Sequence, residues 1–71
     1  MKIDFDKYAE NEIIHIIREW TGLSQAEFGK RIGKSRDAIY KYESGKYTCN
    51  LSTLKRIAEE FDIKITFEKD E

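Results

Sequence analysis

Residues Ser24–Gly45 read SQAEFGKRIGKSRDAIYKYESG, and they predict two short helices joined at a glycine. Ser24 and Glu27 have the spacing of a capping box. In that motif the serine hydroxyl accepts a hydrogen bond from the N–H three residues on, and the glutamate carboxylate accepts one from the serine N–H. Phe28 and Ile32 lie four residues apart, so they share one face of the first helix.

A glycine turn and a second capped helix follow. Gly33 can end the first helix because glycine adopts the left-handed conformation without a Cβ penalty, and Ser35 can cap the next helix. Gly29, four residues before the turn glycine, lets another helix backbone come close. The second helix has an inward stripe of Ala38, Ile39 and Tyr42 and an outer face of Arg36, Asp37, Tyr40 and Lys41. A turn glycine followed by a capped helix with a polar, basic outer face is typical of a helix-turn-helix.

The length and composition indicate one small soluble domain spanning residues 1–71. A chain this short buries only about 60% of its unfolded surface, so dimerisation would be a natural source of further stability. There is no apolar run of the ~20 residues that a membrane span needs and no signal-peptide core, so we expect a cytoplasmic protein. The single Cys49 has no partner for a disulfide or a metal site, so we expect a small loop residue and no metal or cofactor.

The charge of the chain is unevenly distributed. The net charge is −1, yet residues 22–50 hold six Lys and Arg against three Asp and Glu, a net charge of +3. The flanking segments, residues 1–21 and 51–71, each carry −2. Because the local field governs docking onto phosphates more than the net charge does, this distribution favours a nucleic-acid partner for the middle third.

Helical periodicity extends on both sides of this stretch. We expect helices at about residues 6–21, 24–32, 35–43 and 50–61. The apolar stripe of the first helix is Ala9, Ile13, Ile16, Ile17 and Trp20, and that of the fourth is Leu51, Leu54, Ile57, Ala58 and Phe61. Ile14 falls off its stripe and is expected to be partly exposed, His15 is expected on the surface, and Asn50 is a good N-cap.

The C-terminal alternation at residues 63–67 predicts a strand. A lone strand is not stable, so it needs a partner, and three arrangements are open. It can pair with residues 2–5 of the same chain, pair with its own copy across a two-fold axis, or stay disordered. Exposing Ile63, Ile65 and Phe67 would forgo several kcal/mol of burial at ~25 cal/mol per Å², which disfavours disorder. We favour antiparallel pairing across the axis of a homodimer.

Together these motifs resemble the lambda-repressor-like family of DNA-binding domains, often called the Cro/CI or Xre type, from Ile17 to Ile63. The resemblance rests on R-x-x-x-G-L-S-Q at 18–25, on Phe28-Gly29 with Gly33, on S-x-x-x-I-x-x-Y-E-x-G at 35–45 and on L-x-x-L-x-x-I-A at 51–58. It implies a mostly α fold of four or five helices, with the 35–42 helix in the major groove of double-stranded DNA.

The resemblance also implies roles for individual residues. The base-facing positions are Arg36, which can pair with guanine, Asp37, which can accept from cytosine or orient Arg36, Tyr40, which can pack on a thymine methyl, and Lys41. Phosphate contacts are implied for Gln25, Lys34, Ser35, Lys46 and Tyr47, and also suit Lys41. Arg18 and Glu43 match a structural ion pair. The chain departs from the family pattern at four positions. Lys34 stands where an apolar residue is usual, Gly29 where alanine is usual, Tyr40 where serine is common and Cys49 where proline is common.

These observations predict a sequence-specific transcriptional regulator, a repressor that binds a near-palindromic operator as a dimer. An alternative is an antitoxin-like module that binds a partner protein and regulates its own expression, using the acidic flanks and Ile14. An enzyme is not indicated, since the chain has one histidine, no nucleophile–base pair and no metal-ligand spacing.

Overall fold

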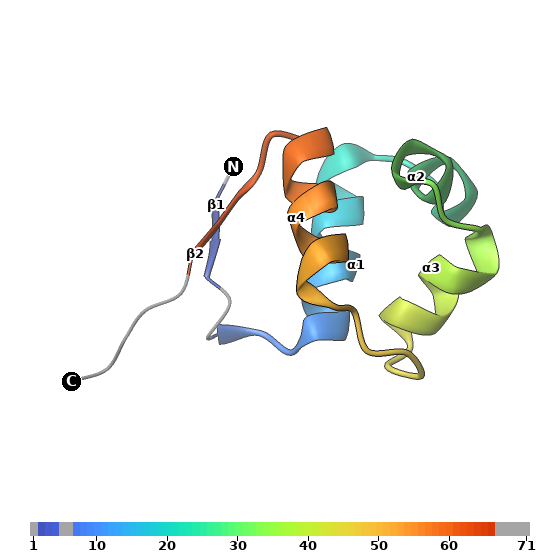
Figure 1. Cartoon of the computed structure of the whole chain (residues 1–71), viewed down its shortest axis with the longest axis horizontal. Coiled ribbons are helices and arrows are strands. Elements are labelled where there is room, and N and C mark those ends of the chain that lie inside the picture. The colour runs from blue at the N-terminus through green and yellow to red at the C-terminus, as the bar shows by residue number, and fades with distance from the viewer. Residues whose placement is uncertain (1, 5–6, 67–71) are drawn as a thin grey trace.

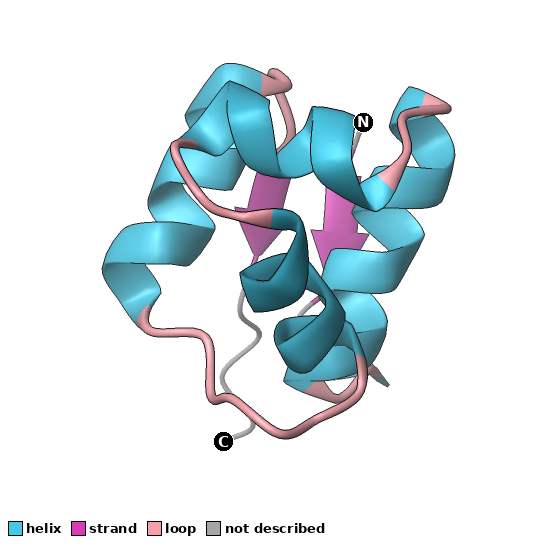
Figure 2. Ribbon diagram, turned by 90° about the vertical axis from the view of Figure 1, so that its right-hand side faces the viewer, coloured by secondary structure: helices cyan, strands magenta, loops and turns pink. Residues whose placement is uncertain are grey.

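The computed structural model describes residues 2–4 and 7–66, which form a bundle of four short helices with a two-stranded sheet at one end (Figure 1). The elements are β1 (Lys2–Asp4), α1 (Glu10–Thr21), α2 (Gln25–Ile32), α3 (Arg36–Glu43), α4 (Leu51–Glu60) and β2 (Lys64–Thr66). Helices α1 and α4 lie in the middle, with α2 and α3 on one side and the strands on the other (Figure 1). Figure 2 looks onto the α2–α3 side, and the strands lie behind the helices. The mostly helical fold expected from the sequence is confirmed.

Helix α1 begins later than the sequence predicts. We expected a start near residue 6 or 7, but Ala9 is the N-cap, with extended backbone at φ −69° and ψ 155°. The carboxylate of Glu12 accepts a hydrogen bond from the Ala9 N–H at 3.1 Å, which supplies half of a capping box and fixes the start of the helix. The helical spacing of the apolar residues places Ala9 on the stripe of the first helix, so it does not reveal that Ala9 is the N-cap.

The buried face of α1 is rotated relative to the expected stripe. Ile14, expected to be partly exposed, has 0% exposure, as do Ile13 and Ile17, so that expectation is wrong. Trp20, expected to be inward, is 41% exposed. Helix α1 has neighbours on more than one side (Figure 1), so a wider arc of its surface is covered than a single stripe supplies.

The three predicted serine and asparagine caps form. The Ser24 hydroxyl accepts from the Glu27 N–H at 3.1 Å and the Glu27 carboxylate accepts from the Ser24 N–H at 3.0 Å. The Ser35 hydroxyl accepts from the Ala38 N–H at 3.1 Å. The Asn50 carbonyl oxygen accepts from the Thr53 N–H at 2.8 Å. The chain after α2 turns at Gly33, whose φ of 73° lies in the left-handed region.

Close packing at Gly29 brings α2 and α3 together. A Cβ atom at this position would lie 2.5 Å from the Lys34 carbonyl oxygen and 3.1 Å from Cγ1 of Ile39. Such a distance to a backbone atom is too short for any side chain, so the close approach expected from the sequence is confirmed.

The two strands pair in parallel within the chain, with Ile3 opposite Ile65. The preferred pairing of the C-terminal strand across a two-fold axis is therefore wrong for this edge of β2. Asp62, at φ 53°, turns the chain after α4, so that Ile63 enters the core and β2 runs beside β1, where Ile3 is buried as well. Ile65 is partly buried, and Phe67 lies outside the described residues.

The core extends from the sheet through all four helices as one cluster. Its buried members are Ile3, Ile13, Ile14, Ile17, Phe28, Ile32, Ile39, Cys49, Leu54, Ile57 and Ile63. The Phe28 and Phe61 rings stack with centroids 5.0 Å apart. Cys49 is a core residue rather than a simple loop residue, and burial raises the pKa of its thiol to about 11. Leu51, expected on the inward stripe of α4, is exposed because it occupies the first helical position beside the cap.

Candidate nucleic-acid interface

Helix α3 lies on the α2–α3 side of the molecule, which faces the viewer in Figure 2. The short connection of Gly33, Lys34 and Ser35 fixes its start, since the Ser35 hydroxyl is used as the cap. Ile39 is buried beneath the helix. Arg36 and Asp37 are exposed, and Tyr40 is 50% exposed, so these three expected base-facing side chains are accessible.

Lys41 joins α3 to the loop that follows it. Its Nζ lies 3.0 Å from Oδ2 of Asp37 and donates to the Tyr47 hydroxyl at 3.2 Å. These hydrogen bonds, to Asp37 first and then to Tyr47, raise the pKa of Lys41. The Asp37 carboxylate therefore pairs with Lys41 through one of its two oxygens.

The loop after α3 folds back over the helix. The Tyr47 N–H donates to the Lys41 carbonyl oxygen at 3.1 Å, and the Tyr47 ring meets the Tyr42 ring edge-on at 6.1 Å. Nζ of Lys46 lies 5.9 Å from the centre of the Tyr40 ring. Two candidate phosphate contacts are thus held beside two candidate base contacts on one continuous surface.

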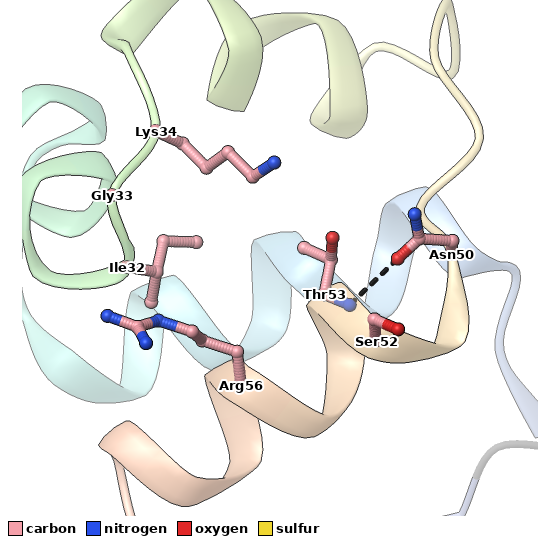
Figure 3. A pocket seen from close by; sticks show the side chains of 7 residues that line it. All are labelled: Ile32, Gly33, Lys34, Asn50, Ser52, Thr53 and Arg56. Carbon is pink, nitrogen blue, oxygen red and sulfur yellow. Dashed lines mark hydrogen bonds between the residues drawn. The ribbon is translucent and has the colours of Figure 1, made fainter.

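The other candidate phosphate contacts come from α2 and the turn. Gln25 is the first residue of α2 and is partly buried. Lys34 is exposed, and its side chain extends from the turn toward the first turn of α4 (Figure 3). It therefore stands apart from the outer face of α3.

Behind α3, Arg18 and Glu43 meet as the resemblance implies. Nε of Arg18 donates to Oε2 of Glu43 at 2.7 Å, and a second guanidinium N–H donates to Oε1 at 3.0 Å. Another Arg18 N–H donates to the Leu23 carbonyl oxygen at 3.1 Å. The Glu43 side chain is 8% exposed. This pair ties α1 to the last turn of α3 and so sets the orientation of the exposed helix.

His15 joins Arg18 and Glu43 as a third member of this cluster, a role that the sequence did not predict. Its Nδ1 lies 2.7 Å from Oε1 of Glu43 and its Nε2 lies 2.6 Å from Oε1 of Glu19. These contacts, mainly the hydrogen bond to Glu43, raise the pKa of His15. Burial pushes the pKa of Glu43 upward, but the hydrogen bonds from Arg18 and His15 outweigh it, so that pKa is lowered. The three-residue spacing of His15 and Arg18 on α1 is the signal that could have revealed the cluster.

Among residues 2–4 and 7–66, no three His, Cys, Asp or Glu side chains converge in a way that could hold a metal ion. Within the same part of the chain, every helix is too short or too polar to cross a membrane.

Helices α2 and α3 are joined by a turn at Gly33, and α3 is exposed and held to α1 by the Arg18–Glu43 ion pair. This arrangement defines a helix-turn-helix domain. A helix-turn-helix family model matches residues 14–67, and the chain belongs to this family, of the Cro/CI and Xre type. The fold is similar to that of the P22 c2 repressor in a crystal structure with a synthetic operator, 9T, and Tl⁺. The TM-score is 0.69 and the identity 24%, over 80% of this chain and 86% of the repressor chain. No curated protein sequence matches the chain.

Proposed function

We propose that this protein is a sequence-specific DNA-binding regulator that represses transcription by occupying an operator. The observation that carries the proposal is the continuous exposed surface of α3 and its following loop, in which Arg36, Tyr40 and Lys46 are accessible. Family membership and the operator-bound state of the structurally similar c2 repressor support it. The concentration of positive charge in residues 22–50 supports it independently.

In this proposal α3 lies in the major groove. Arg36 donates two hydrogen bonds to a guanine, and Tyr40 packs on a thymine methyl. Asp37 accepts from a cytosine through its second carboxylate oxygen, and we assign Lys41, which pairs with Oδ2 of Asp37, mainly to phosphate. Gln25, Lys34, Ser35, Lys46 and Tyr47 complete the phosphate contacts, which position the helix without specifying sequence.

We further propose that the protein binds a near-palindromic operator as a homodimer. One edge of β2 is occupied by β1, so a ribbon of two β2 strands would have to use the other edge of β2. The alternative of an antitoxin-like module loses one of its two expected contact features, because Ile14 is fully buried.

DNA titrations at several salt concentrations test this function. The logarithm of the binding constant should fall linearly with that of the salt concentration, with a slope of about −0.9 per phosphate contact. Arg36→Ala should relax base preference and cost ~1–3 kcal/mol, whereas Lys46→Ala should weaken all duplexes alike. Lys7→Ala, exposed ahead of α1 and outside the proposed contact surface, is the charge-matched control. Absence of DNA binding even at low salt would refute the proposal, and selection from a random duplex pool would show whether the site is palindromic.

A further inference from the structure

The ammonium group of Lys41 is held from two sides, by α3 itself and by the loop that follows it. Its Nζ lies 3.0 Å from Oδ2 of Asp37, one turn earlier on the helix, and donates to the Tyr47 hydroxyl at 3.2 Å. The same Nζ lies 4.9 Å from the centre of the Tyr47 ring. The Lys41 side chain is 32% exposed and that of Asp37 is 72% exposed, so the carboxylate takes its position from the more enclosed ammonium.

The helical pair alone is too weak to fix the Asp37 carboxylate. Asp37 and Lys41 are four residues apart with the acid nearer the N-terminus, which is the favourable order on a helix. An exposed pair at this spacing still favours the paired state only about twofold. The hydrogen bond from Lys41 to Tyr47 adds a constraint that the pair lacks, because it restricts the long lysine side chain before Asp37 pairs with it.

Tyr47 is fixed without help from Asp37. Its N–H donates to the Lys41 carbonyl oxygen at 3.1 Å, and its ring meets the Tyr42 ring edge-on with centroids 6.1 Å apart. The Ser44 hydroxyl donates to the same Lys41 carbonyl oxygen at 3.2 Å. The loop is thus anchored to the last turn of α3 by backbone and ring contacts, and the Tyr47 hydroxyl is a stationary acceptor for Lys41.

This arrangement leaves each of the three side chains a partner on DNA. A carboxylate beside a duplex is repelled by the phosphates, and the adjacent Lys41 charge offsets that repulsion. With Oδ2 of Asp37 taken by Lys41, the second oxygen can accept from the amino group of a cytosine. An ammonium has three donors, and a phenol both donates and accepts, so Lys41 and Tyr47 can still donate to phosphate.

We propose that Tyr47 is a positioning residue for base recognition: its hydroxyl holds Lys41, and Lys41 holds the Asp37 carboxylate in the orientation that selects a cytosine. Tyr47 itself contacts no base. The proposal rests on the proposed function, because it concerns how α3 reads DNA. It gives the loop after α3 a part in sequence preference, whereas phosphate contacts from the same loop only position the helix.

Base preference at a single operator position tests this role. In an operator selected from a random duplex pool, Asp37→Ala first identifies the base pair at which Asp37 acts. Affinities are then measured for all four base pairs at that position. Tyr47→Phe should lower the preference for cytosine there about three- to tenfold, as for a lost hydrogen bond to a charged group. Preferences at other positions and the salt slope should not change, because no charge is removed.

Two further variants isolate the contact with Lys41. In Lys41→Met, adding Tyr47→Phe should change the cytosine preference no further, because the hydroxyl then has no ammonium to hold. Tyr8→Phe, which also loses one hydroxyl but lies exposed ahead of α1, is the matched control and should keep the full preference.

A titration by nuclear magnetic resonance tests the same contact on the protein without DNA. The pKa of Lys41 should be lower in Tyr47→Phe than in the unsubstituted protein, because the hydrogen bond to Tyr47, after the one to Asp37, raises it.

The positioning role is overturned if Tyr47→Phe keeps the full cytosine preference, if its affinity falls equally for all four base pairs, or if the Lys41 pKa is unchanged. It is also overturned if Asp37→Ala alters the preference at no position. In each of these cases the unsubstituted protein still binds a selected operator, so the proposed function stands. Failure of the unsubstituted protein to bind any duplex refutes the proposed function, and the positioning role with it.

Discussion

Replacing Arg18 with methionine would remove both guanidinium hydrogen bonds to Glu43, at 2.7 and 3.0 Å, and leave a carboxylate of 8% exposure with His15 as its remaining cation. Breaking a buried ion pair by removing one partner costs ~3–5 kcal/mol. Because His15 still supplies part of the compensation, we expect a loss of about 3 kcal/mol, near the lower end of that range. A domain of this length has a free energy of unfolding of about 4–10 kcal/mol, so the loss is large.

The double variant Arg18→Met, Glu43→Leu should be more stable than Arg18→Met alone. With both charges replaced by apolar side chains of similar size no uncompensated charge remains, and such replacements are often near neutral. Relative to the unsubstituted protein, we expect the double variant to lose about 1 kcal/mol of unfolding free energy, because the hydrogen bond from Arg18 to the Leu23 carbonyl oxygen is also removed.

Urea unfolding at pH 7, followed by circular dichroism, measures these differences. Arg31→Met is the matched control, because its partner Glu60 lies at 2.8 Å on the surface and such a pair is worth only ~0–1 kcal/mol. If the double variant is no more stable than Arg18→Met, the cluster is an ordinary surface network and the reasoning is refuted.

Three further predictions concern His15, Gly29 and Cys49. The pKa of His15 is raised on folding, so its contribution to stability is complete below about pH 6.5 and is lost as the pH rises through the folded pKa. His15→Gln should flatten the unfolding free energy measured between pH 6 and 9, and an unchanged profile would contradict the assignment. Gly29→Ala should destabilise by about 1–2 kcal/mol in thermal unfolding, because overpacking of ~1–3 kcal/mol against the Lys34 carbonyl exceeds the helix-propensity gain of up to ~1 kcal/mol. A stable variant would show that the turn can move. Cys49, buried and with a thiol pKa of about 11, should react with a thiol reagent only in the unfolded protein, so rapid reaction under native conditions would be inconsistent with its place in the core.

The helix-turn-helix could be predicted from the sequence because its determinants are local. Ser24, Ser35 and Asn50 each act on a backbone N–H three residues away, and Gly33 acts through its own backbone conformation. Short-range rules of this kind hold wherever the chain does not override them.

The features that could not be predicted from the sequence depend on contacts between distant segments. The burial of Ile14 depends on how many neighbours α1 has, and the strand pairing depends on where the turn at Asp62 directs the chain. His15 gains its role only when α3 brings Glu43 to α1.

The parallel strand pair has a consequence for the order of folding. Its contacts join residues as far apart in sequence as Ile3 and Thr66, which are separated by 63 positions, whereas α2 and α3 adjoin through a three-residue turn. Closing so long a loop costs more entropy than closing a short turn, so we expect the helices to assemble first and the strands to close the chain last. We therefore expect β1 and β2 to separate more readily than α2 and α3. Hydrogen exchange at the strand amides would accordingly be faster than at the helical amides of α2 and α3.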